Sequence, residues 1–237
     1  MESLNRTMRA GVTTEALYDE GLRQHMLRVY NFMLMGLGLT GATALAVASS
    51  PAMMGLIFGT PLQWVVMLAP LGFVFFLSFR ADKISAATAQ TLFWTFCAVM
   101  GLSLASIFHV FTGASIARVF FITAAMFGAM SLFGYTTKRD LSNWGSFLIM
   151  GLFGVIIAMI VNIFLQSSML QFVVSIVGVI VFTGLAAYDT QRIKEVYHEG
   201  HGTEGLTKLA VLGALSLYLS FINLFMMLLS LLGQRDD

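Results

Sequence analysis

Residues 141–188 contain no Asp, Glu, Lys or Arg, and most of them are apolar. Further charge-free runs cover residues 29–79, 84–117, 119–137 and 209–234. A helix needs about 20 consecutive apolar residues to cross a bilayer, so each long run can hold one or two spans. Charged residues make up only 11% of the chain, against about 25% in ordinary soluble domains. The sequence therefore predicts an all-α integral membrane protein.

Helix breakers and charges divide these runs into seven predicted spans. The Ser-Ser-Pro sequence at 49–51 ends the first helix, because proline lacks a backbone donor, and the polar Gln-Ser-Ser turn at 166–168 ends the fifth. The predicted spans are residues 29–49, 62–79, 84–108, 115–135, 144–165, 169–189 and 209–232. They form one transmembrane domain at 27–233, between an N-terminal segment (1–26) and a short tail (234–237).

Lys and Arg are divided unequally between the two sides of the predicted bundle. Of the 13 such residues, only Arg118 and Arg235 fall outside the N-terminal segment and the loops after the second, fourth and sixth spans. Cytoplasmic loops carry the excess of Lys and Arg. The N-terminus is therefore predicted to be cytoplasmic and the C-terminus outside, which requires an odd number of spans.

The first charge after residues 141–188 is Asp189, within "GLAAYDTQRIK" (184–194). A carboxylate at the membrane edge is costly and by default faces the bundle interior or water, with a partner nearby. Position alone leaves two interpretations open: a functional carboxylate, or one solvated just inside the cytoplasm. Arg80, at the end of the second span, is predicted at the same depth on the same side, so an ion pair with Asp189 is topologically possible.

Other polar residues are expected to face the interior of the bundle. Asn162 and Asn223 can hydrogen-bond between helices, and Ser220 lies one turn before Asn223 on the same face. Ala124 and Gly128 are small residues at four-residue spacing and suit close helix packing.

The chain is not expected to be an enzyme or to bind a cofactor or nucleic acid. An intramembrane aspartyl protease needs two carboxylates, and no later span contains an Asp. The sequence also lacks a glycine-rich phosphate loop and a basic patch interleaved with aromatics. His198 and His201 are flanked by acids, but two histidines on a loop fix neither geometry nor ligand number.

Three segments carry a family resemblance: "TGASIARVFFITAAMFGAMSLFGYTTKRDLS" (112–142), "GLAAYDTQRIK" (184–194) and "LYLSFINLF" (217–225). Together, in this order, they resemble the Bax inhibitor family (the transmembrane Bax-inhibitor-motif, or TMBIM, proteins) in its bacterial branch. The likeness covers about residues 25–233. It implies a seven-helix bundle in the bacterial inner membrane, with a central last helix and the other six wrapped around it as two groups of three.

The resemblance also implies a pH-sensitive calcium leak channel. In the family pattern two aspartates at the cytoplasmic end of the pore hydrogen-bond to one another and sense pH, and an arginine of the second helix latches onto one of them. Asp189 matches the first aspartate and the ligand of the transported Ca²⁺, and Arg80 matches the latch. Asn223 and Asn162 are further pore-facing candidates. Ser220 stands where the pattern has the second aspartate.

The serine changes the expected behaviour. Two carboxylates in contact raise one pKa strongly and titrate as a coupled pair, whereas serine does not titrate in this range. We therefore expect a weak, single-site pH dependence and poorer calcium binding at the mouth. The alternative is a non-conducting protein that binds other membrane proteins, such as a protease. Its docking element would be the N-terminal segment, which is otherwise expected to be a disordered tail with a short amphipathic stretch.

Overall fold

The computed structural model describes residues 2–80, 83–197 and 202–236, which fold as helices joined by short connections. An isolated β-bridge joins Phe111 to Arg235, and the described residues form no strand. The helices are α1 (Glu2–Ala48), α2 (Pro51–Phe58), α3 (Leu62–Arg80), α4 (Ala86–Leu104), α5 (Ile107–Val110), α6 (Gly113–Thr136), α7 (Ser142–Leu165), α8 (Ser168–Val196) and α9 (Gly202–Leu232).

Several helices begin where the sequence supplies a capping hydroxyl. Ser50 accepts a hydrogen bond from the backbone N–H of Met53, and Pro51 follows as the first residue of α2. Ser167 caps α8 in the same way, directly after Gln166, whose φ of 48° ends α7 in the left-handed region. Such caps satisfy backbone donors that have no partner within the helix. The breaks predicted at 49–51 and 166–168 are confirmed.

Six helical segments among the described residues are long and apolar enough to cross a membrane. They are Asp19–Ala48, Ala86–Val110, Gly113–Thr136, Ser142–Leu165, Ser168–Val196 and Gly202–Leu232. The predicted second span corresponds to α3, which follows α2 at an angle of 79° after a short break. A seventh span exists only if this bent pair counts as one.

The structure differs from the predicted boundaries in three places. α1 is continuous from residue 2 to 48, so the N-terminal segment is helical rather than disordered. This segment contains no proline, which is the residue that interrupts a helix most strongly. α8 continues for nearly two turns beyond the predicted end at residue 189, through good helix formers. The predicted third span is divided at residues 105–106 into α4 and α5.

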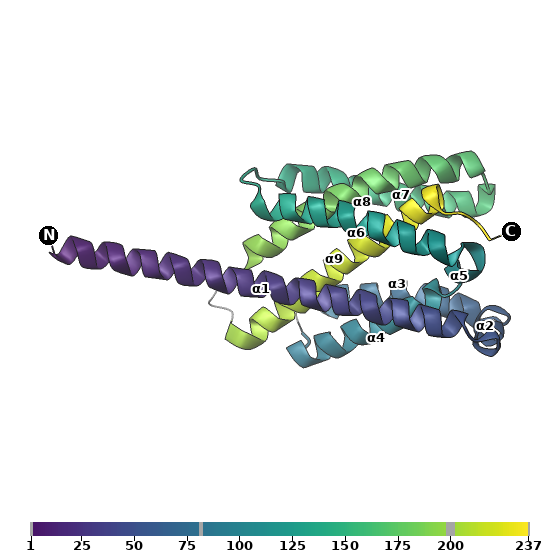
Figure 1. Cartoon of the computed structure of the whole chain (residues 1–237), viewed down its shortest axis with the longest axis horizontal. Coiled ribbons are helices and arrows are strands. Elements are labelled where there is room, and N and C mark those ends of the chain that lie inside the picture. The colour runs from purple at the N-terminus through teal and green to yellow at the C-terminus, as the bar shows by residue number, and fades with distance from the viewer. Residues whose placement is uncertain (1, 81–82, 198–201, 237) are drawn as a thin grey trace.

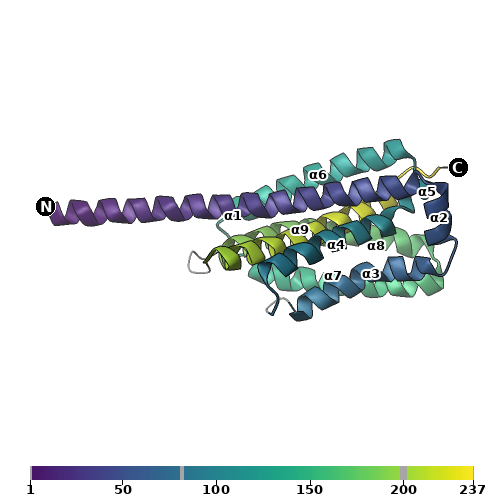
Figure 2. The ribbon, with the colours of Figure 1, turned by 90° about the horizontal axis from the view of Figure 1, so that it is seen from below.

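The last helix is the most buried of the six candidate spans. In its most apolar stretch 61% of the residues are buried, against 11–39% in the other five. α9 packs against α1, α4, α6 and α8, while α3 packs on α4 and α7 packs on α8. Figures 1 and 2 show α9 running obliquely between these neighbours. This packing favours the predicted central position of the last helix.

Tyr218 is the largest fully buried side chain and connects α9 to two neighbouring helices. Its hydroxyl lies 2.7 Å from Thr40 Oγ1 of α1. Its ring meets Phe93 and Phe96 of α4 edge-on, with centroids 6.2 and 5.6 Å apart. Edge-to-face aromatic pairs stabilise a core by about 0.5–1.5 kcal/mol beyond burial of area. The centre of the bundle is therefore held by the packing of these aromatic rings and by the hydrogen bond of the Tyr218 hydroxyl.

The two ends of the molecule carry different connections. The N-terminal half of α1 projects beyond the bundle at one end, where α3, α6 and α8 end and α4, α7 and α9 begin (Figure 1). The C-terminus lies at the opposite end, beside α2 and α5. We call the first the basic end, because most of the Lys and Arg residues lie on the first part of α1 or on the helix ends and connections there, and the other the outer end. Termini at opposite ends are what the predicted orientation requires, and that orientation stays a prediction.

Candidate functional site

Asp189 is buried in the last part of α8. Its exposed fraction is 9%, and the neighbouring Ala186, Ala187 and Thr190 are buried as well. This part of the bundle is covered because α8 packs against α6, α7 and α9 at once. Asp189 therefore lies in the interior of the basic end rather than in open solvent.

Two serines of α9 lie next to the carboxylate. The Ser220 hydroxyl donates a hydrogen bond of 2.9 Å to Asp189 Oδ2, and this contact is buried. Ser216, one turn earlier on the same face of α9, lies beside Asp189 and lines the same cavity. The structure thus brings together Asp189 and Ser220, the pair singled out in the sequence. Ser216 was missed, although its four-residue spacing from Ser220 is a signal that could have found it.

A cavity of about 260 Å³ opens beside the carboxylate. Its polar wall consists of His25, Asp189, Arg192 and Ser216, and side chains such as Leu209 and Val196 complete the lining. The charge of Arg192, one turn after Asp189 on α8, acts on the carboxylate. A cavity of this size and polarity has room for several water molecules.

His25 of α1 is the second titratable side chain of the cavity wall, and sequence reasoning missed it. Its exposed fraction is only 5%. Its ring lies 5.3 Å from the ring of Tyr197, and its Nδ1 has no hydrogen-bond partner among the described residues. A buried polar atom without a partner costs free energy and here lies on a polar cavity. No spacing or motif in the sequence connects residue 25 with residue 189.

Arg80 does not contact Asp189 in the structure. Its side chain is exposed at the end of α3, and within the described ranges it forms no ion pair. α3 packs on α4 and α2 rather than on α8, so the helix that carries the predicted latch is separated from the carboxylate. The predicted tether is therefore absent from this conformation, and Arg192 supplies the positive charge that acts on Asp189.

The two asparagines serve local structure. Asn162 lies at the α7–α8 turn, at the outer end, where its side chain accepts a hydrogen bond from the Ser167 N–H and donates one to Gln171. Asn223 donates to the carbonyl of Leu219 on its own helix, at 2.8 Å. Asn162 does bond between helices as expected, but far from Asp189, and the expected interhelical bond of Asn223 is not formed.

Hydroxyls next to Asp189 connect three helices. Tyr30 of α1 lies 2.6 Å from Ser131 of α6, and Ser131 lies 2.7 Å from Thr190 of α8. Gln191 accepts a hydrogen bond from the Leu141 N–H and donates one to the Arg139 carbonyl, which holds the α6–α7 connection. The backbone that presents the carboxylate is therefore anchored on both sides.

This arrangement suits a hydrated cation more than a tightly held metal. A carboxylate oxygen is the hard ligand that calcium prefers, and Asp189 is one such group beside a polar cavity. In the part of the chain that the structure describes, no three His, Cys, Asp or Glu side chains gather at a possible metal site. His198 and His201 lie outside the described residues. The described residues around Asp189 therefore offer few ligands that would hold a metal ion tightly.

Comparison with known proteins extends the likeness to most of the chain. Residues 22–237 match the family model described as "Inhibitor of apoptosis-promoting Bax1". The chain is 48% identical over 218 residues to the inner membrane protein YbhL of Escherichia coli K12, covering 91% of this chain and 93% of YbhL. It is 47% identical over 220 residues to a protein of Rickettsia prowazekii, covering 93% of each. A protein of Caulobacter vibrioides is 47% identical over 229 residues, covering 92% of each.

Proposed function

Because the chain belongs to the Bax inhibitor family, we propose that this inner membrane protein is a calcium leak channel whose conduction depends on Asp189. The observation that carries the proposal is the buried carboxylate itself, 9% exposed and hydrogen-bonded to Ser220 beside a polar cavity. Burying a charged group in a membrane protein is costly and marks ion pathways by default. A purely structural role would be served as well by a neutral side chain.

The cavity supplies the vestibule of the proposed path. It lies at the basic end, where the orientation from Lys and Arg places the cytoplasm. Asp189 would draw the cation in, and the Ser220 hydroxyl keeps the carboxylate facing α9. The low ligand number lets the ion leave again, which conduction requires as much as binding.

The pH dependence of the proposed channel should be shallow. With Ser220 in the second position, one carboxylate titrates at the α8–α9 contact rather than a coupled pair. Asp140, in the nearby α6–α7 connection, does not contribute, because hydrogen bonds from Ser142 hold the pKa of that carboxyl below its usual value and keep it ionised near neutral pH. His25, on the same cavity wall, is a histidine, the side-chain type that titrates near neutral pH, so the measurement must separate its effect from that of Asp189.

The test is calcium flux into liposomes that contain the purified protein, measured between about pH 6 and 8, where histidine and raised carboxylates titrate. The chain should conduct above empty liposomes, and Asp189→Asn should lower the flux because it removes the charge that attracts the cation. His25→Phe should leave the pH response in place. If the unchanged chain does not conduct, or Asp189→Asn conducts as well as the unchanged chain, the proposal is wrong.

One observation favours a second candidate, a non-conducting interaction protein. The N-terminal half of α1 is helical and projects beyond the bundle (Figure 2), which places a helical segment where a membrane-protein partner would dock. An interaction protein has no reason to conduct. Deleting residues 2–18 would then abolish co-purification of the partner, whereas a channel should keep its flux.

A further inference from the structure

A long groove lies between α1 and α6 on the side of the bundle. Its volume is about 530 Å³, within the range of pockets that hold small ligands. Both helices pack on α9, and Phe221 of α9 contributes to the lining between them. Because both walls belong to candidate membrane spans, the groove is surrounded by lipid.

The wall formed by α6 is hollow where close packing was expected. Ala124 and Gly128 both line the groove and both are exposed. A Cβ atom added at Gly128 would meet nothing within 4 Å. Among the described residues no helix packs closely on this pair, so the two small residues leave an open space beside α6.

The groove has the length of one membrane leaflet. Along α1 its lining runs from Arg23 to Leu34, and along α6 from Tyr135 to Ala124. Eleven residues of helix rise by about 16 Å, which is roughly half of a 30 Å hydrocarbon core. Arg23 and Tyr135 stand at the basic end, so the groove covers the leaflet on that side.

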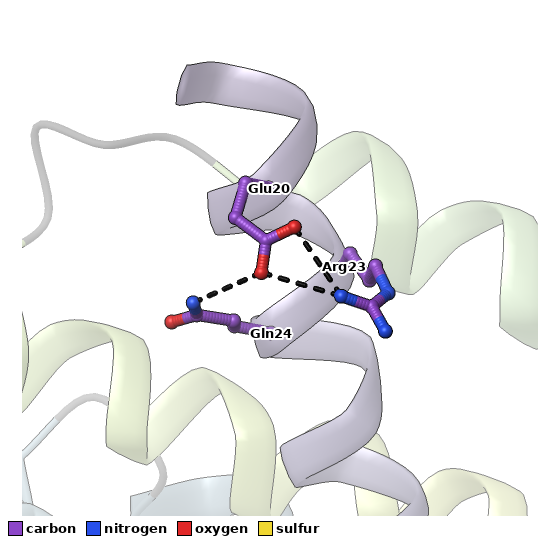
Figure 3. Close-up of polar contacts among 3 residues, drawn as sticks. All are labelled: Glu20, Arg23 and Gln24. Carbon is purple, nitrogen blue, oxygen red and sulfur yellow. Dashed lines mark hydrogen bonds and ion pairs between the residues drawn. The ribbon is translucent and has the colours of Figure 1, made fainter. Parts of the chain in front are cut away.

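One cationic side chain lines the groove where a lipid headgroup would lie. Arg23 lines the groove, and its guanidinium contacts Glu20 through one nitrogen, Nη1, at 3.3 Å from each carboxylate oxygen (Figure 3). Strong charge-assisted bonds are shorter, about 2.7–2.9 Å, and such exposed pairs contribute little to stability. Lys194 lies over the ring of Tyr135, 5.5 Å from its centroid. Arg23 can therefore turn from Glu20 to a phosphate at little cost.

We propose that the α1–α6 groove binds one acyl chain of an anionic phospholipid, with its phosphate held at Arg23. The methylenes lie along Leu27, Gly128 and Leu34, and the headgroup stays among the polar residues of the basic end. Basic pockets between transmembrane helices on the cytoplasmic side are suited to anionic headgroups. The inference is independent of conduction, since it needs only the membrane setting and the groove.

Native mass spectrometry of the full chain in detergent tests the proposal, with phosphatidylglycerol and phosphatidylcholine of identical acyl chains as probes. Phosphatidylglycerol should bind about fivefold more tightly, the factor that one Arg near an anionic headgroup contributes. Arg23→Gln should remove this preference and leave binding of both lipids at the weaker level. Inorganic phosphate in excess should not displace the lipid, because it lacks the chain.

Two variants test the groove itself. Gly128→Leu fills it from α6 and Leu34→Trp from α1, and each should abolish retention of both lipids. Gly154→Leu on α7 is the matched control, because a Cβ there also meets nothing within 4 Å but the residue lies outside the groove lining. Equal retention of the two lipids by the unchanged chain, or a lipid peak that survives both filling variants, would overturn the proposal. So would a dimer that Gly128→Leu dissociates, since the occupant would then be a second copy of the chain.

Discussion

The α8–α9 contact carries polar groups at both ends of the helix pair, and the two ends differ in kind. At the basic end, Asp189 accepts a hydrogen bond from Ser220 beside a cavity that Ser216 also lines. At the outer end, Ser230 accepts hydrogen bonds from Gln171 and Ser175. Both sets join the same helices. Neutral hydrogen bonds between membrane helices are structural by default, whereas a buried charge that opens onto a cavity needs a further reason.

The largest difference between the ends should appear in stability. Ser216→Ala with Ser220→Ala leaves the carboxylate buried without its Ser220 donor, and hydrogen bonds to charged groups contribute about 1.5–3 kcal/mol each. We expect the free energy of unfolding to fall by about 1.5–3 kcal/mol, chiefly through loss of the Ser220 bond. Ser175→Ala with Ser230→Ala should cost about 1 kcal/mol, since such neutral bonds average about 0.6 kcal/mol. Reversible unfolding in mixed micelles measures both.

A third substitution controls that comparison. Adding Asp189→Leu to the Ser216→Ala/Ser220→Ala variant removes the stranded charge, so part of the lost stability should return. If the two double variants lose the same free energy of unfolding, the buried charge at the basic end contributes no more to stability than the neutral hydrogen bonds at the outer end. The proposed difference between the two ends is then wrong.

Conduction should separate the ends by about tenfold. Asp189→Asn removes a charge whose attraction for the ion at the mouth corresponds to about 1.4 kcal/mol, which is a factor of ten. Ser230→Ala, at the outer end, should leave calcium flux within about twofold of the unchanged chain. If Ser230→Ala lost much of the calcium flux and Asp189→Asn lost none, the residues that control conduction would lie at the outer end.

The steepness of the pH response of the flux gives another comparison between the two ends. Ser220→Asp places a second carboxylate against Asp189, and the flux should then change over a narrower pH interval, because two carboxylates in contact titrate as a coupled pair. Ser230→Asp adds the same charge at the outer end, away from Asp189, and should leave the response as shallow as before. Flux measured in small pH steps distinguishes the two variants.

The smallest expected effect concerns His25. Its Nδ1 is buried without a protein partner among the described residues, so His25→Phe should keep the ring contact with Tyr197 and raise stability by about 1 kcal/mol. Thermal unfolding of the two proteins provides the measurement. A lower melting temperature for His25→Phe would show that water or an ion in the cavity satisfies the histidine.

Sequence patterns predicted the parts of this molecule that depend on one helix at a time. Long apolar runs identified the helices, and the Asp189 and Ser220 motifs identified the two residues that meet across α8 and α9. Features that depend on three helices were missed. His25 reaches the cavity only because α1, α8 and α9 converge there. The apolar run also could not show that α3 stays on α4, which leaves Arg80 exposed.

Local spacing misled where it was read without the neighbouring helix. Ala124 and Gly128 have the spacing of a helix-packing motif, yet they face the groove. The N-terminal segment has mixed charge and no long apolar run, so its helical continuation into α1 was not predicted. In both cases the residue types were identified correctly, but the neighbouring helices determine the structure that these residues adopt and what they contact.

The burial of α9 has a consequence for how the protein is made. α9 follows α1–α8 in the chain, yet it is the helix against which α1, α4, α6 and α8 pack. During synthesis, the earlier helices enter the bilayer before their common partner exists. Until α9 arrives they must wait as a loose assembly, with Thr40 and the Asp189 carboxylate lacking their α9 partners. Membrane quality-control proteases would therefore encounter the chain in its least packed form before α9 has left the ribosome.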